Sequence, residues 1–174
     1  MATNLEFITS FDITASQEVT DIDNVFTSKY NIYQITFADF STVGSSDETI
    51  SLRIIDDSGT LDSDNVYDYA VNELRSDTSY ADNKNENFER IDRLMKIDES
   101  PDGMSCNLYV YNPQISSAFT FFTWQGAGRF SGQSRGFKGI AAHKVAEAVR
   151  GIRIFGTVGS RPYDTGKIAV YGVT

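Results

Sequence analysis

Residues 50–54 read Ile50-Ser51-Leu52-Arg53-Ile54, with apolar side chains at even positions and polar ones between them. Successive side chains of a β-strand point to opposite faces, so this alternation predicts a strand with one buried face. Similar alternation recurs between turns rich in Gly, Pro, Asp and Ser. The further segments expected to be strands are residues 5–13, 33–37, 107–111, 119–124, 152–155 and 167–171. Short strands separated by turns predict an all-β sandwich or barrel.

The first of these segments carries apolar side chains at odd positions. Leu5, Phe7, Phe11 and Ile13 alternate with Glu6, Ser10 and Asp12. Because side chains two residues apart lie on the same face of a strand, we expect these four apolar side chains to share one buried face.

Three other stretches are harder to assign. Residues 66–74 and 141–150 each fit a helical face or an alternating strand, and we favour strand because both are short. Residues 126–136 contain four glycines and are expected to form a long loop between strands.

Length and composition predict one folded domain over residues 1–174. The chain has 40% apolar and 13% aromatic residues, too many for a disordered protein. It has no run of about 20 apolar residues, so no membrane helix is expected, and residues 1–6 lack the features of a signal peptide. Cys106 is the only cysteine, so an intrachain disulfide is excluded. These features favour folding in a cytoplasm.

The net charge of −9 argues against nucleic acid as a partner. Residues 1–102 hold 22 Asp and Glu against 7 Lys and Arg, a balance of −15, whereas residues 103–174 have a balance of +6. We expect acidic loops of one copy to meet a basic surface of a neighbour. The residues assigned to this assembly surface are Arg129, Arg135 and Lys138.

The search for catalytic groups gives an enzyme little support. His143 is the only histidine, so a catalytic triad would have to pass through it, and no Gly-x-Ser-x-Gly turn is present. We interpret His143 as a strand residue with a satisfied ring nitrogen. Cys106 flanks an apolar run and is interpreted as an inert packing residue. No catalytic residue is therefore assigned.

No cofactor or metal is expected either. The Asp-rich residues 56–64 invite a calcium interpretation but lack the ligand register of a calcium loop, so a solvated hairpin loop is favoured. Gly126-Ala127-Gly128 lacks the full spacing of a dinucleotide-binding loop, and Gly156 to Ser160 lacks the lysine of a phosphate loop.

Aromatic residues offer a different function, the stacking of sugar rings. Trp124, Tyr109, Tyr111 and Tyr163 are the candidates, with Trp124 and Tyr163 assigned as glycan contacts. The alternative is that these rings belong to the sandwich core, which we favour for Trp124 because it shares a strand face with Phe122.

Several segments resemble a family of small jelly-roll structural and tail-fibre-like proteins of marine and cyanobacterial tailed phages. Residues 152–156, followed after a loop by Thr165-Gly166-Lys167-Ile168-Ala169-Val170-Tyr171-Gly172-Val173, resemble the family's closing hairpin. Residues 22–33 resemble its opening segment, and residues 51–59, 67–70, 137–140 and 143–145 also match. The resemblance spans about residues 5–174.

This resemblance implies a jelly-roll-like antiparallel β-sandwich and a non-enzymatic role on the exterior of a virion. Such proteins serve as capsid decoration or cement, or as head or tail fibre components. The expected partners are other copies of the chain, most simply in a trimer, and other virion proteins. The alternative is a carbohydrate-binding receptor-recognition module of a tail fibre, with host surface glycan as its partner.

Overall fold

The computed structural model describes residues 4–14, 17–42, 47–77, 80–99, 102–157 and 163–174. These residues form twelve strands and, within the described part, no helix. The strands are β1 (Leu5–Ile13), β2 (Val19–Ile22), β3 (Ile32–Thr42), β4 (Glu48–Asp56), β5 (Tyr67–Arg75), β6 (Ala81–Phe88), β7 (Ile91–Ile97), β8 (Met104–Tyr111), β9 (Thr120–Phe130), β10 (Gln133–His143), β11 (Val149–Gly156) and β12 (Tyr163–Val173).

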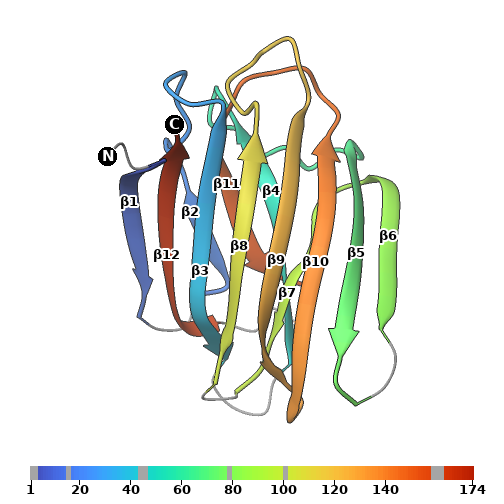
Figure 1. Cartoon of the computed structure of the whole chain (residues 1–174). Coiled ribbons are helices and arrows are strands. Elements are labelled where there is room, and N and C mark those ends of the chain that lie inside the picture. The colour runs from blue at the N-terminus through green and yellow to red at the C-terminus, as the bar shows by residue number, and fades with distance from the viewer. Residues whose placement is uncertain (1–3, 15–16, 43–46, 78–79, 100–101, 158–162) are drawn as a thin grey trace.

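Two antiparallel sheets form a sandwich (Figure 1). The larger sheet has the order β1-β12-β3-β8-β9-β10-β5-β6, and the smaller has the order β2-β11-β4-β7. If β5, β6, β9 and β10 are set aside, eight strands remain and can be renumbered 1 to 8 along the chain. One sheet then has the order 1-8-3-6 (β1-β12-β3-β8), and the other has the order 2-7-4-5 (β2-β11-β4-β7). This is the jelly-roll order, so the expected fold class is confirmed.

One apolar core lies between the sheets. Its largest fully buried side chains are aromatic: Tyr33, Tyr67, Tyr163, Phe37, Phe40, Phe122 and Phe137. Two of the fully buried tyrosines keep their hydroxyls paired, because Tyr33 donates to the Thr27 carbonyl at 2.7 Å and Tyr67 to the Asp62 carbonyl at 2.9 Å. These bonds tie loops to the core at fixed places.

The first strand departs from simple alternation. The register between β1 and β12 shifts between Phe7 and Thr9, as in a β-bulge. Phe11 and Ile13 pack on the core as expected, but Leu5 and Phe7 are 40% and 58% exposed. The prediction that all four share the buried face is therefore wrong, because the extra residue moves Leu5 and Phe7 to the outer face.

The glycine-rich residues are strand rather than loop. Residues 126–136 belong to β9 and β10, which are joined at Ser131 and Gly132, both with positive φ as in a two-residue hairpin turn. A Cβ on Gly128 would lie 2.3 Å from the Gly103 carbonyl oxygen, so this glycine permits a close backbone approach. Of the ambiguous stretches, residues 66–74 fall largely in β5, whereas residues 141–150 contain a loop between β10 and β11.

The prediction that residues 152–156 and 165–173 pair with each other as a closing hairpin is wrong. β11 pairs with β2 and β4 in the smaller sheet, whereas β12 pairs with β1 and β3 in the larger one. The two strands are consecutive in the chain but lie in opposite layers, as the jelly-roll order requires. β12 therefore occupies an interior position of its sheet.

Candidate functional site

The outer face of the eight-stranded sheet carries two adjacent rows of mostly apolar and aromatic side chains. Residues paired across antiparallel strands share a face, so the strand register identifies neighbours in each row. We call these two rows the outer band. One row is Leu5, Val173, Ile32, Tyr111, Phe121 and Ala142, and the other is Phe7, Tyr171, Gln34, Tyr109, Thr123 and Ile140.

The band is exposed on its first strand and on its last two strands. Phe7 of β1 is 58% exposed, Phe121 of β9 46% and Ile140 of β10 61%, whereas the side chains of the band on β12, β3 and β8 are half-buried. With strands about 4.8 Å apart, the five spacings from β1 to β10 give a width of about 24 Å. Scattered exposed apolar residues are normal in proteins, but a continuous patch marks a contact surface.

Shallow hollows lie along the part of the band that crosses β8, β9 and β10. One of about 500 Å³ is lined by Tyr111, Phe121 and Ile140 and by residues of β5 and β6. Another of about 320 Å³ is bordered by Tyr109 and Ile140, with Asn107, Gln125 and Lys138 adding polar groups. The rings of Tyr109 and Tyr111 stack at 6.4 Å between centroids. The surface thus combines apolar area with a polar border.

The two residues assigned to glycan contact lie in the core instead. Trp124 is 2% exposed and Tyr163 is fully buried. Trp124 points inward from β9 over Gly139, where an added Cβ would lie 2.1 Å from its ring. The assignment of Trp124 and Tyr163 is therefore wrong, whereas Tyr109 and Tyr111 lie on the outer face.

The expected basic assembly surface is divided between two faces. Arg129 and Lys138 point outward from β9 and β10, but Arg135 points inward, with a side chain only 9% exposed. Arg129 pairs with Asp102 at 3.0 Å, and Arg135 pairs with Glu73 at 2.5 Å. These three residues therefore do not form one surface.

The charge imbalance along the sequence is largely used within the chain. Basic residues of the second part pair with acidic residues of the first, because the jelly roll brings the two parts together. Two of these pairs are bidentate, Arg150 with Asp23 and Arg153 with Asp21. The others are Lys144 with Asp68, Lys167 with Asp12, Arg129 with Asp102 and Arg135 with Glu73. Most of the described basic residues in the second part therefore have a counter-charge within the chain.

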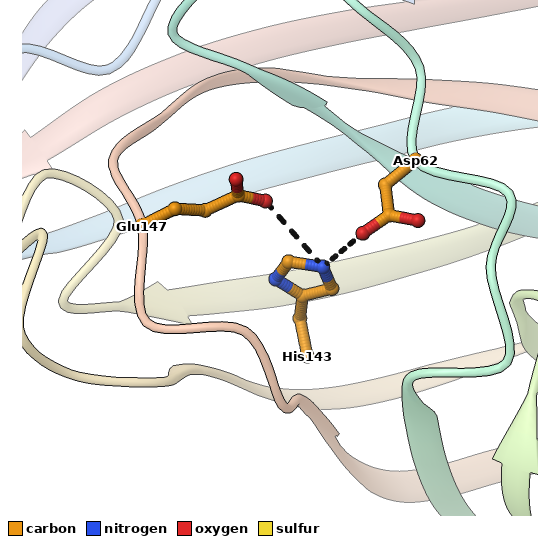
Figure 2. A group of neighbouring side chains, drawn as sticks. All are labelled: Asp62, His143 and Glu147. Atoms are coloured by element: carbon orange, nitrogen blue, oxygen red, sulfur yellow. Dashed lines mark hydrogen bonds and ion pairs between the residues drawn. The ribbon is translucent and has the colours of Figure 1, made fainter.

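His143 lies in a polar group with Asp62 and Glu147 (Figure 2). Its side chain is fully buried at the end of β10, and Nε2 lies 2.7 Å from Asp62 Oδ2 and 3.7 Å from Glu147 Oε1. The Tyr67 ring lies 5.1 Å from the imidazole. The expectation of a satisfied ring nitrogen is met at Nε2 only, because Nδ1 is buried without a hydrogen-bond partner.

This group has the residue types of an acid–base pair, with an aspartate beside a histidine. Burial raises the pKa of the Glu147 carboxyl, and the Asp62 and Asp56 carboxylates add to this while His143 lowers it. Among the described residues, however, no serine, threonine or cysteine hydroxyl or thiol is hydrogen-bonded to His143. Nothing in this geometry activates a nucleophile.

The same three side chains are of the kinds that bind divalent cations, and their ligand atoms lie within 4.8 Å of one another. A metal at Nε2 would displace the proton shared with Asp62, and a metal-bound imidazole normally donates its other N–H to a partner. Nδ1 has no such partner here. The residues present therefore fit a tight metal poorly.

We expect the melting temperature to change by less than about 1 °C in millimolar Ca²⁺ or Zn²⁺. An ion at a hundredfold excess over its Kd would add about 2.7 kcal/mol, a rise of roughly 5–10 °C. Differential scanning calorimetry with and without chelator checks this. A rise of several degrees that disappears in Glu147→Gln would show that the group holds a metal.

Cys106 and the Asp-rich loop take structural roles. Cys106 is buried, and burial raises the pKa of its thiol to about 12, which leaves it protonated and unreactive. In the loop, Asp56 accepts hydrogen bonds from the Ser58 hydroxyl and the Thr60 amide, an arrangement that closes the turn by itself.

Comparisons with known proteins add no family to this description. No family model matches the chain, and no curated protein matches it. A solved crystal structure of a human SPRY domain is similar at 9% identity and a TM-score of 0.21, covering 87% of this chain and 98% of that one. At this level of similarity, the sandwich is established by the strand pairing alone. Within the described residues, no helix has the length and apolar character needed to span a membrane.

Proposed function

We propose that the protein is a non-enzymatic structural component of the exterior of a tailed-phage virion and acts through protein–protein assembly. The outer band is the observation that carries the proposal. It offers exposed apolar area in the centre of a rigid sheet, bordered by polar residues such as Asn107, Gln125 and Lys138. An apolar centre with a polar rim is the usual arrangement of a protein interface.

The virion setting of this proposal rests on the sequence resemblance, and the outer band supports protein–protein assembly as the mode of action. The expected contact is between copies of the chain through this face, as capsid decoration or fibre proteins use repeated contacts.

Ile140→Asp should weaken self-association at least about tenfold, because it places a charge in the most exposed part of the band. Sedimentation velocity across a concentration series measures this. Leu74→Asp is a matched control, because Leu74 is 54% exposed on the same sheet face but lies outside the two rows of the band. A wild-type protein that stays monomeric, or equal association in both variants, would contradict the proposal.

A second candidate is a carbohydrate-binding receptor-recognition module. It is favoured by the hollow at Tyr109, where an aromatic ring lies beside the amide groups of Asn107 and Gln125. A glycan array distinguishes the two functions. Sugar binding that is lost in Tyr109→Ala but kept in Leu74→Asp would favour this candidate over assembly.

A further inference from the structure

A cluster of four basic side chains lies on the other face of the larger sheet, away from the outer band. Arg75 of β5 and Arg135 of β10 are paired in register and point inward. β7, an edge strand of the smaller sheet, adds Arg93 and Lys96. We call these four residues the basic cluster.

All four surround one buried carboxylate. The Glu73 side chain is 2% exposed, and its Oε1 lies 2.5 Å from Arg135 Nη1 and 3.2 Å from Arg75 Nε. Its Oε2 lies 3.1 Å from Lys96 Nζ and 3.8 Å from Arg93 Nη1. Two of the cations also lie over the Phe130 ring, Lys96 at 5.6 Å and Arg135 at 5.4 Å.

The charges in the cluster do not balance. Among the ion pairs of the described residues, Glu73 is the single carboxylate that pairs with these four cations. Four positive charges therefore face one negative charge, an excess of three. Three guanidinium groups and one ammonium group carry roughly 18 N–H donors, whereas a carboxylate offers about four acceptor sites. This excess lies in a chain whose net charge is −9.

Donors in the cluster remain available. The Arg135 side chain is only 9% exposed, and its Nε is buried without a hydrogen-bond partner. Arg75 and Arg93 have side chains 29% and 30% exposed, so the cluster opens to solvent. Arg93 also has a φ of 60° where the register of β7 against β4 is irregular, a conformation that a non-glycine residue keeps only when its surroundings hold it.

From this geometry we infer that the basic cluster is a binding site for an oxyanion, a carboxylate, sulfate or phosphate group that Arg75 and Arg93 contact from the solvent side. Planar guanidinium groups bind such anions through paired N–H donors. The oxyanion completes a cluster that Glu73 neutralises only in part.

Sulfate is the probe for the first experiment, with chloride at equal ionic strength as the reference. We expect sulfate to raise the melting temperature of the wild type by several degrees more than chloride does. The Arg75→Gln/Arg93→Gln double variant should lose this difference. Arg129→Gln, which changes an exposed arginine on the outer face, should keep it.

Sulfate also stabilises proteins in general through exclusion from their surface, so the variants decide the outcome. An equal sulfate effect in the double variant and in Arg129→Gln would overturn the inference, as would no effect in the wild type. If the double variant does not fold, titration calorimetry of the wild type decides: saturable heat with sulfate but not chloride supports the site, and its absence refutes it. Sulfate should also restore part of the stability of Glu73→Gln, in which the positive excess is larger.

Light scattering in the two salts distinguishes two sources of the oxyanion, an acidic side chain of another copy and a free anion. If an acidic side chain of another copy fills the site, the wild type associates in chloride and sulfate dissociates it. If a free anion fills it, the mass is the same in both salts. Because the basic cluster and the outer band lie on opposite faces, Ile140→Asp tests the assembly proposal without altering this site, and either can fail alone.

Discussion

Changing Glu73 to Gln should lower the free energy of unfolding by about 3–5 kcal/mol, because it leaves four cations around a buried site without their shared counter-charge. For a chain of this length, such a loss lowers the melting temperature by roughly 10 °C. Thermal and urea unfolding measure it. Glu6→Gln is the matched control, since Glu6 pairs with Lys29 at the exposed surface and its loss should leave the melting temperature unchanged.

The same carboxylate makes stability depend on pH. Burial raises the pKa of Glu73, but the ion pairs with Lys96, Arg75 and Arg135 outweigh it and hold the pKa below its ordinary value of 4.5. Its contribution is therefore present above about pH 4.5 and is lost as the pH falls through the folded-state pKa. Stability of the wild type should decline more steeply in this acidic range than that of Glu73→Gln. Parallel curves would show that Glu73 is not the group responsible.

Ending the chain after Gly166 should abolish soluble folding. The truncation removes most of β12, which pairs with β1 on one side and β3 on the other, and it removes the fully buried Ile168 and Val170. Both neighbouring strands would then expose unpaired backbone groups and apolar side chains, which favours aggregation.

Comparing soluble and insoluble fractions after expression checks the effect of this truncation. Removing only Thr174 is the control, because it leaves β12 complete, and that protein should stay soluble with an unchanged melting temperature. A soluble product after Gly166 with the wild-type melting temperature would mean that β12 is dispensable, against the sheet order described here.

Alternation in the sequence predicted several core strands because their apolar side chains share one buried face. β8 alternates as expected, and β4 keeps Ile50, Leu52 and Ile54 buried, although Ser51 between them is buried as well. β6 could not be found this way, because Ala81–Phe88 is an edge strand with mostly exposed polar side chains. The bulge at Phe7 was hidden as well, since one extra residue changes which side chains face inward without changing the composition.

The sites were less predictable than the strands. Asp62 and Glu147 meet His143 from separate loops, and Glu73 meets four cations from three strands, so no local spacing marks either group. The outer band likewise depends on the register of six strands. A sequence pattern reports which residues share a strand face, whereas these sites depend on which strands become neighbours.

The place of β12 between β1 and β3 also sets the order in which this protein can fold. The first strand has only one neighbour in its sheet, and that neighbour is the last strand of the chain. During synthesis, β1 must therefore wait, unpaired, until β12 has been made, about 150 residues later. Contacts that close such long stretches of chain form slowly. The larger sheet should consequently close late and slowly, and β1 and β3 would need protection from other chains during that interval.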